Sequence, residues 1–380
     1  MAADDRTGAL EVAGACADAA RVPVLVHVGD GACATPSADD AAIVVVDVAT
    51  RHLAAVTAGA VAAEVDAAMR TDGAGRSATA HKIDSTLRGN WAHELVARHR
   101  ASGRRVLVVP AFPAVGRQCV RGVVIVDGVP VAESAAASDV RGPVASSRPA
   151  DLLRAAGADQ VREVAPGGSL DAWWSAGESF AVCDAATDDD LRLVAAGWAA
   201  HSTDVLFAGT AGSIGAAAGA LRRAHVRADG PIVRPGSETS LVRLPALVVC
   251  GSLHPVARAQ VRSLRAANDE RLTVLASPEP VERPVPHDAA VAAAEALARS
   301  ANVAIDDGSY RTVVIIGGDT AAAILGDASV MVGGTVAAGM PWFRLAANDG
   351  PLFITKAGGF GGPDALTDLL LGTAGERTTR

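Results

Sequence analysis

The sequence is poor in aromatic residues, in net positive charge and in long apolar runs. Aromatic residues make up 3% of the 380 residues, and the net charge is −8. Such a chain offers few rings for base stacking and no diffuse positive field, so nucleic acid is not an expected partner. The most apolar stretches, such as 42–48 and 312–316, are much shorter than the roughly 20 residues that span a bilayer. We therefore expect no membrane contact either.

Cysteine is scarce as well. The five cysteines are an odd number, are widely spaced and include no C-x-x-C pair. This pattern favours neither a disulfide framework nor a metal site, so we interpret them as reduced, small apolar residues. They are Cys16, Cys33, Cys119, Cys183 and Cys250. The N-terminus is acidic rather than basic and lacks the apolar middle of a secretory signal, which predicts a cytoplasmic protein.

Short β-branched runs alternate with alanine-rich amphipathic stretches along the whole chain. A chain of this length, 50% hydrophobic, exceeds the roughly 250–300 residues at which single cores stop growing, so we expect two domains. The alternation predicts two α/β domains with largely parallel sheets flanked by helices. In the first half, strands are expected at 22–28, 43–48, 106–109, 180–183 and 205–207, and helices at 54–69, 91–100, 188–200 and 213–223. In the second half, strands are expected at 247–249, 272–275, 312–316 and 352–355, and helices at 255–267 and 289–300.

The residue composition changes at the boundary between the two halves of the chain. Residues 226–243 contain the turn signals Asp229-Gly230-Pro231 and Pro235-Gly236 and little apolar periodicity, as a linker would. The predicted domains are therefore residues 1–225 and 244–380. Within the first, residues 123–133 alternate around Asp127-Gly128, which predicts a hairpin with a type I′ turn.

Lysine is almost absent, which draws attention to the two that remain. Of 34 Lys and Arg residues, only Lys82 and Lys356 are lysines. An ammonium is a compact charge that fits among phosphate oxygens or beside a reacting hydroxyl, where a guanidinium does not. Two residues are a small sample, and chance is the alternative. Because both lie in dense polar or glycine-rich motifs, we expect functional roles.

The first motif is the run of residues 81–90, directly before the helix expected at Trp91. It packs Lys82, Arg88, Asp84, Ser85 and Thr86 into a strand-to-helix turn. Ligands of open α/β sheets bind at such turns, and the unpaired N–H groups of a helix N-terminus attract anions. A carboxylate or phosphate is therefore expected here. The alternative is a capped, solvated loop with Ser85 or Asn90 as the N-cap.

A second motif stands at the start of the chain. Asp4 and Asp5 precede Arg6, Thr7 and Gly8 and lead into an apolar helical stretch. Adjacent carboxylates suit a general base or an acceptor for sugar hydroxyls. Acidic N-terminal turns also occur simply as helix caps, which is the competing interpretation.

The third group consists of three glycine turns in the second half. Gly251-Ser252, Gly317-Gly318-Asp319-Thr320 and Lys356-Ala357-Gly358-Gly359 each follow a predicted strand. Glycine lets backbone N–H groups approach phosphates without a Cβ in the way. Neither a G-x-x-x-x-G-K-[ST] motif nor the protein-kinase signature set is present. A nucleotide site of another kind is predicted.

Taken in order, these motifs resemble the four-carbon acid sugar kinases, which phosphorylate threonate, erythronate or 3-oxo-tetronate with ATP. The resemblance extends over nearly the whole chain, and the run from Lys82 to Asn90 is its most specific part. Further motifs that match are Pro110-Ala111-Phe112-Pro113 with Gly116-Arg117, Gly212-Ser213 and Phe360-Gly361.

The resemblance implies a sugar-acid domain followed by an ATP domain, with the active site in the interdomain cleft and transfer to the terminal hydroxyl. Carried over by position, it implies catalytic roles for Asp5, Lys82 and Asp84, substrate binding by Asp5, Ser85 and Arg88, and ATP binding by Ser252, Gly317, Gly318, Asp319, Thr320 and Gly359. From its charge and its place in a glycine turn we add Lys356 as a catalytic residue, and we add Gly358 of the same turn for ATP. Phosphoryl transfer needs a carboxylate to receive the hydroxyl proton, either Asp5 or Asp84. Mg²⁺ is implied without named ligands.

Two departures from the family pattern stand near the N-terminus. Only three residues precede Asp4, where the family has an apolar strand, so we expect a poorly ordered terminus and reduced sugar-acid affinity. Arg6 replaces an apolar residue, which puts the substrate in question.

Two other functions compete. A nicotinamide-dependent dehydrogenase of a small hydroxy acid could use Gly209 to Gly215, but the spacing is G-x-x-G-x-x-G and the expected acidic partner is missing. A non-catalytic sugar-acid sensor would need neither Lys356 nor the glycine turns. The acid, its stereochemistry and the oligomeric state stay open, with a homodimer as one option.

Overall fold

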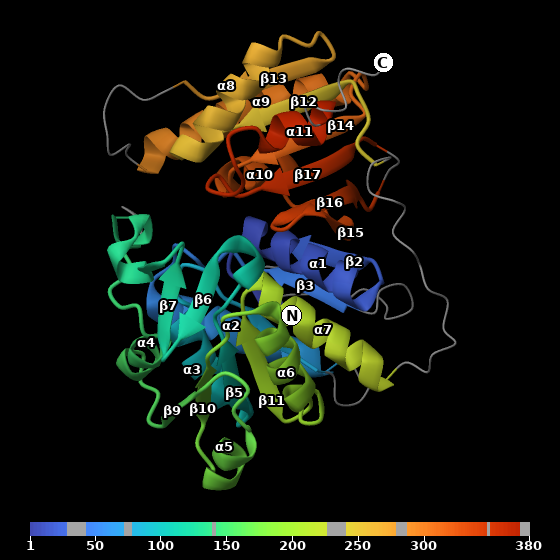
Figure 1. The fold of residues 1–380 in the computed structure, drawn as a ribbon. Coiled ribbons are helices and arrows are strands. Elements are labelled where there is room, and N and C mark those ends of the chain that lie inside the picture. Colours follow the sequence, from blue (N-terminus) through green and yellow to red (C-terminus); the bar gives the residue numbers. More distant parts are fainter. Residues whose placement is uncertain are drawn as a thin grey trace. The chain divides into compact units, whose positions relative to one another are not determined.

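The chain divides into two compact units, Met1–Val233 and Arg234–Arg380, each built of strands and helices (Figure 1). The computed structural model describes residues 1–28, 43–71, 78–138, 142–225, 241–278, 287–347 and 350–372. The predicted linker 226–243 lies outside these residues except for its last three. Among the helices that the structure describes, none combines the length and the apolar character needed to cross a membrane.

The first unit contains a parallel sheet with the strand order β2-β3-β1-β4-β11-β5-β10-β9. Its strands are β1 (Ala2–Ala3), β2 (Val24–Val28), β3 (Ile43–Asp47), β4 (Ala80–Lys82), β5 (Arg105–Val109), β9 (Val161–Val164), β10 (Phe180–Cys183) and β11 (Val205–Gly209). The five strands predicted here are confirmed to within two residues at their ends. Continuous Val and Ile runs identify them because parallel strands are buried on both faces.

Helices cover both faces of this sheet. They are α1 (Arg6–Ala20), α2 (Ala55–Thr71), α3 (Trp91–Ser102), α4 (Pro149–Ala155), α5 (Asp171–Ala176), α6 (Asp188–Ala199) and α7 (Ala211–His225), with short 3₁₀ turns at Pro113–Val115, Val131–Glu133 and Ala135–Ser138. The helix α7 packs against α1 and α6, whereas α2 packs against α3. The predicted α/β class is therefore confirmed for this unit.

The expected poorly ordered N-terminus is wrong. Ala2 and Ala3 form β1, which pairs with β3 on one side and β4 on the other, and both residues are 0% exposed. The backbone N–H of Val46 donates to the Met1 carbonyl at 2.8 Å, and that of Val48 donates to the Ala3 carbonyl at 2.9 Å. Two residues suffice because neighbours on both sides satisfy their backbone groups, and alanine side chains fit under the covering helices.

The register of this sheet positions the first candidate site. Ala3 is level with Asp47 of β3 and Lys82 of β4, and Lys82 is level with Gly209 of β11. The chain moves from β1 toward β2 and β3, then returns to the other side of β1 for β4. This reversal is a topological switch point, and ligands of open α/β sheets bind just beyond the strand ends at such a point.

A separate small sheet contains the predicted hairpin. Its strands are β6 (Arg117–Val120), β7 (Val123–Val126) and β8 (Val129–Pro130), paired antiparallel. Asp127 and Gly128 have φ of 50° and 87°, so both central residues are left-handed, as a type I′ turn requires. The hairpin prediction is confirmed.

The second unit has the strand order β13-β12-β14-β17-β16-β15. Its elements are β12 (Ala246–Cys250), α8 (Pro255–Ala267), β13 (Leu272–Ala276), α9 (His287–Asp306), β14 (Thr312–Ile316), α10 (Gly318–Leu325), β15 (Val330–Ala337), β16 (Met340–Leu345), β17 (Leu352–Lys356) and α11 (Ala365–Leu371). The first four strands in this order are parallel, as predicted, and β16 and β15 add an antiparallel edge that was not predicted. A buried apolar cluster joins β12, β14 and β17 to α8 and α11.

Substitution of Ala3 by Leu tests whether β1 is held in the sheet. Ala3 is 0% exposed between two strands, so Ala3→Leu should overpack the core and lower the free energy of unfolding by about 1–3 kcal/mol. Urea unfolding measures this, with Ala196→Leu on the exposed side of α6 as the matched control. Equal stability of the two variants would mean that β1 is not held between its neighbours.

Candidate functional site

The first candidate site is a group of charged side chains just beyond the ends of β3, β1 and β4. Arg51, in the turn after β3, donates from Nε and Nη2 to the two oxygens of Asp4, at 2.8 Å each. Its Nη1 donates to Asp5, and its Nη2 lies 3.6 Å from Asp84 Oδ1. One guanidinium therefore joins the carboxylates that follow two neighbouring strands.

Asp84 organises the turn between β4 and α3. Its Oδ2 accepts a hydrogen bond from the Thr86 backbone at 3.1 Å and another from the Thr86 hydroxyl. Arg88 donates from Nε to Oδ2 at 2.9 Å and from Nη2 to Oδ1 at 3.0 Å. The Arg88 side chain is 37% exposed, against 13% for Arg51 and 2% for Lys82. Arg88 is therefore the cation of this group that a ligand reaches most readily.

Asn90 precedes α3 but does not cap it with its side chain. Its amide nitrogen instead donates to the carbonyl oxygens of Thr50 and Leu53, at 3.0 and 2.9 Å. These bonds hold the turn that carries Arg51. The alternative of a merely capped loop, with Asn90 as the capping side chain, is wrong on this point.

Lys82 is the buried cation of the group. It ends β4, is 1% exposed, and donates from Nζ to the Ile83 carbonyl at 2.8 Å. Glu11 of α1 brings its Oε2 to 3.4 Å from the same nitrogen. A buried ammonium is costly unless it is paired, and Glu11 supplies the paired charge.

Two glycines permit this close packing. A Cβ on Gly8 would lie 2.6 Å from Asp5 Oδ1 and 3.6 Å from Lys82 Nζ. Gly89 has φ of +85°, and a Cβ there would lie 2.8 Å from Asp4 Oδ2. Any larger residue at either position would push the carboxylates away from their cations.

The surroundings of the two candidate bases, Asp5 and Asp84, shift their pKa values in opposite directions. Burial raises the pKa of Asp5, with Arg51 opposing the shift and Asp4 adding to it. Burial acts on Asp84 in the same direction, but the charges of Arg88 and Arg51 outweigh it and hold the pKa of Asp84 well below its usual value. Asp5 is therefore the better proton acceptor near neutral pH.

The structure brings together most residues predicted for the sugar acid. Asp5, Lys82, Asp84 and Arg88 belong to the charged group, and Ser85 is buried in the same turn. Arg6, by contrast, pairs with Asp47 at 2.9 Å, and both side chains are 5% exposed. Its charge is thus paired beside the group rather than within it.

Sequence reasoning missed Arg51 and Glu11. Arg51 follows a predicted strand, but only the strand order shows that β3 lies next to β1. Glu11 could have been predicted from the sequence, because it is the one charged residue in the apolar run 9–17 of an expected helix. A single carboxylate in such a run calls for a buried partner.

The second candidate site lies in the other unit, beyond β12, β14 and β17. The register places Cys250, Ile316 and Lys356 level with one another, so the three predicted glycine turns start at one edge of the sheet. The Gly317 backbone donates to the Lys356 carbonyl at 3.1 Å, and the Gly251 backbone donates to the Ile316 carbonyl at 3.2 Å. The turn after β12 is the switch point of this sheet, because β13 and β14 flank that strand.

These turns contact one another closely. A Cβ on Gly317, whose φ is +111°, would lie 3.4 Å from the Ser252 nitrogen and 3.5 Å from Thr320 Oγ1. A Cβ on Gly358 would collide with Ser252 Oγ and lie 3.1 Å from His254 Cβ. His254, which sequence reasoning did not single out, precedes α8, and its Nδ1 accepts a hydrogen bond from the backbone N–H of Val256, the second residue of that helix. The predicted residues Ser252, Gly317, Thr320, Gly358 and Gly359 thus lie together, and Gly318 and Asp319 open α10 beside them.

Lys356 differs from Lys82 in its partners. It is 1% exposed, and its Nζ donates to the carbonyl oxygens of Ala357 at 2.9 Å and Gly358 at 3.5 Å. Burial lowers the pKa of Lys356 to about 8. An incoming anion would favour the charged form, so the ammonium is suited to receive a phosphate.

Helix α8 holds the glycine-rich turn after β17 in place. Gln260, 0% exposed, donates from Nε2 to the carbonyl oxygens of Phe360 at 3.0 Å and Gly362 at 2.8 Å. One turn further along α8, Ser263 donates to Asp364 at 2.6 Å. The backbone that lines the second site is therefore fixed from a neighbouring helix.

Thiols and resident metal clusters add no further centre in the described parts of the chain. Cys16, Cys119, Cys183 and Cys250 are buried and unpaired, and burial raises the pKa of each thiol, to about 12 for Cys16 and Cys183. Cys33 lies outside the described residues. Among these residues no group of three metal-binding side chains occurs.

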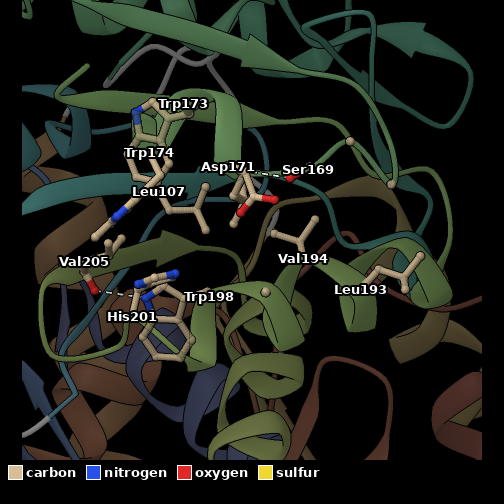
Figure 2. Close-up of a pocket in the computed structure, with 14 residues that line it drawn as sticks. Leu107, Ser169, Asp171, Trp173, Trp174, Leu193, Val194, Trp198, His201 and Val205 are labelled. Atoms are coloured by element: carbon tan, nitrogen blue, oxygen red, sulfur yellow. Dashed lines mark hydrogen bonds between the residues drawn. The ribbon is translucent and has the colours of Figure 1, made fainter. Parts of the chain in front are cut away.

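A cavity of about 310 Å³ in the first unit lies away from the predicted residues (Figure 2). Its lining includes Trp173, Trp174, Trp198, Asp171 and His201, and no Lys or Arg. The Trp174 ring stacks on His201 with centroids 4.2 Å apart and receives the guanidinium of a neighbouring arginine at 4.7 Å. The ring is thus engaged within the protein, and an anion there would face the Asp171 carboxylate. The cavity does not suit a sugar acid.

Comparison with protein families assigns each half of the chain. Residues 1–217 match a sugar-binding N-terminal domain, and residues 269–366 match a nucleotide-binding C-terminal domain. The molecule is thus a two-domain α/β protein with a sugar-binding and a nucleotide-binding domain.

The names of curated relatives indicate more closely to which protein family the chain belongs. A D-threonate kinase from Bordetella bronchiseptica is 30% identical over 96% of this chain and 95% of its own length. A 3-oxo-tetronate kinase from Methylobacterium radiotolerans is 29% identical over 95% of this chain and 96% of its own. The match to D-threonate kinases from Salmonella typhimurium and Cupriavidus necator, at 36% and 32% identity, spans 41% and 62% of those relatives, less than two thirds of each. The chain belongs to the four-carbon acid sugar kinase family.

Solved structures confirm the fold. A Haemophilus influenzae protein has a TM-score of 0.69, with 98% of this chain and 99% of that chain covered, at 18% identity. A Salmonella typhimurium protein described as a tRNA synthase has a TM-score of 0.75, with 99% and 98% covered, also at 18% identity. At such identity the likeness shows the fold alone. A Bordetella bronchiseptica protein, 27% identical with a TM-score of 0.50 and 96% of each chain covered, was solved with bound citrate as a domain-swapped dimer.

Removal of Gln260 tests the role of α8. Gln260→Ala deletes both bonds to the glycine-rich turn, so the affinity for ATP should fall by about 1–3 kcal/mol, roughly five- to 150-fold. Calorimetric titration with ATP measures this. Gln118→Ala, which deletes a 3.0 Å bond to the Ala186 carbonyl in the first unit, is the control and should leave ATP affinity unchanged. A folded Gln260→Ala protein with wild-type ATP affinity would contradict this role.

Proposed function

We propose that the protein transfers the terminal phosphate of ATP to the terminal hydroxyl of a four-carbon sugar acid of the threonate, erythronate or 3-oxo-tetronate class. The observation that carries this proposal is the charged group at the switch point of a sugar-binding domain. It combines cations for a carboxylate with buried carboxylates for hydroxyl groups. The family membership and the names of the relatives support it.

The acid is recognised by residues at the ends of β3, β1 and β4. Arg88 is the most exposed cation and presents a planar fork suited to a carboxylate. Asp5 accepts hydrogen bonds from the sugar hydroxyls and takes the proton from the attacking one, because its raised pKa suits a base. Asp84, whose pKa is held low, keeps Arg88 and Thr86 in position rather than taking up a proton.

The second domain holds the phosphate donor. Gly317, whose φ is +111°, and Gly358, where a Cβ would collide with Ser252 Oγ, belong to turns that a larger residue would disturb. Backbone N–H groups of such glycine turns are suited to bind phosphate. Lys356 neutralises charge on the transferred group. ATP would supply the phosphoryl group, and Mg²⁺ would be held mainly by its phosphates together with one or two carboxylates. The transfer requires both ligands to meet, so the interdomain active site stays a prediction.

Neither alternative gains support. In the stretch 209–215, a Cβ on Gly212 would collide with the Phe112 ring and one on Gly215 would lie 3.0 Å from Ala15 of α1. These glycines therefore serve the packing of α7, which leaves no observation in favour of a dehydrogenase. A sensor has no use for a buried lysine among glycine turns. A homodimer and a cytoplasmic location stay predictions.

The direct test is a coupled assay of ADP release with ATP, Mg²⁺ and each of D-threonate, D-erythronate and 3-oxo-tetronate, followed by phosphorus NMR of the product. We expect ADP release with at least one acid and one new phosphate monoester at its terminal carbon. A folded protein that releases no ADP with any of them would refute the proposal.

Lys356→Ala should leave the fold intact and lower kcat by about a hundredfold or more, as lost phosphate stabilisation does. The pKa of about 8 adds a pH signature. The ammonium is charged below that value and neutral above it, so ATP affinity of the wild type should fall as the pH rises through about 8. Calorimetry from about pH 6.5 to about pH 9.5 measures this. If Lys356→Ala retained the wild-type kcat, or the same fall in ATP affinity, Lys356 would not be the phosphate contact.

A further inference from the structure

The charged group in the sugar-binding domain carries more carboxylates than cations. The contacts described above link four carboxylates, of Asp4, Asp5, Glu11 and Asp84, with three cations, of Arg51, Lys82 and Arg88. With every side chain ionised, the group has one net negative charge. Arg6 and Asp47 neutralise each other beside it. The anion of a sugar acid would add a second negative charge to a largely buried place, which is unfavourable.

Glu11, like Arg51, is a member of the group that lies outside the sequence motifs. It lies on α1 and is 8% exposed, and its Oε2 faces Lys82 Nζ at 3.4 Å. Its other oxygen, Oε1, is buried and has no hydrogen-bond partner in the described structure. The charged groups that face Glu11 are Lys82 of β4, Asp84 of the following turn and Asp5 at the start of α1. A carboxylate with one satisfied and one unsatisfied oxygen, near two other carboxylates, is the natural place for an added proton.

We propose that Glu11 positions Lys82 and takes up a proton when the sugar-acid anion binds. The inference rests on the sugar-acid function proposed above. In the bound state the protonated Glu11 cancels the excess negative charge, its Oε2 still accepts from Lys82, and the proton taken up from solvent removes the charge from the buried Oε1. Burial raises the pKa of Glu11, with Lys82 opposing the shift, and the raised pKa favours this protonation.

The sign of the pH dependence follows from the uptake of a proton. Between the pKa of Glu11 in the free protein and its higher pKa in the complex, each pH unit should weaken binding by about tenfold, and lowering the pH across this range should strengthen it. The sugar acid itself stays ionised between about pH 6 and pH 9. Its own titration therefore does not produce the effect.

The experiment is calorimetric titration with D-threonate, D-erythronate and 3-oxo-tetronate, without nucleotide, in buffers of different ionisation enthalpy. For the wild type at about pH 8 we expect the heat to vary with the buffer as the uptake of about one proton requires. Glu11→Gln keeps the size of the side chain and an oxygen for Lys82 but removes the charge. It should take up no proton, bind independently of pH between about pH 6 and pH 9, and bind at least as tightly as the wild type at pH 8.

Two further variants distinguish the effect of the Glu11 charge from the effect of its contact with Lys82. Asp18→Asn, on the exposed side of α1, removes the same charge from the same helix and should keep the wild-type proton uptake. Glu11→Ala also loses the contact to Lys82, so its kcat should fall about tenfold or more below that of Glu11→Gln, with a smaller change in KM.

Two outcomes would overturn this inference and leave the proposed sugar-acid function standing. They are binding without proton uptake in the wild type, and uptake that persists in Glu11→Gln but disappears in Asp5→Asn. Failure of all three acids to bind a folded wild-type protein would instead overturn the sugar-acid function, and this inference with it.

Discussion

The sugar-binding domain depends on the register of a two-residue strand. Ala3 lies level with Asp47 and Lys82, so the chain leaves β1 into α1 at the same height at which it leaves β3 and β4. Because β1 is the switch point, the turns beyond β3 and β4 flank the start of α1 on either side. The carboxylates of Asp4 and Asp5 are thereby brought against the cations of both turns. A slip of one residue would reverse the direction of these side chains.

Charge pairing then shapes the site. The side chains of Lys82 and Arg51 are 2% and 13% exposed, and carboxylate partners offset the cost of burying these two charges. The same pairing fixes the positions of Asp5 and Asp84 and pushes their pKa values apart, one toward a base and the other toward a permanent anion. The buried lysine of the nucleotide-binding domain has different partners. Lys356 donates to carbonyl oxygens, and its ammonium is suited to pair with phosphate.

The sequence predicted what local patterns determine. Short uninterrupted apolar runs identified most of the buried parallel strands, although not β4 and β9, and Asp127-Gly128 identified the hairpin turn. The strand β1 was missed because two alanines carry no strand signal, and the antiparallel β15 and β16 were missed because β15 contains a glycine pair that interrupts its apolar pattern. Asp5, Lys82 and Arg88 were found from motifs. Arg51 and Glu11 were not, because their partners are set by strand order and helix packing, which are not local properties.

The central claim is that the acid and the nucleotide bind to different domains through the groups described here. Calorimetric titration of Arg88→Ala and Gly358→Val with D-threonate and with ATP tests it most directly. Arg88→Ala should lose about tenfold or more in affinity for the acid and keep its affinity for ATP, because its guanidinium serves the carboxylate. Gly358→Val should do the reverse, because its side chain would collide with Ser252 in the phosphate turns. Loss of both ligands in either folded variant would contradict the assignment.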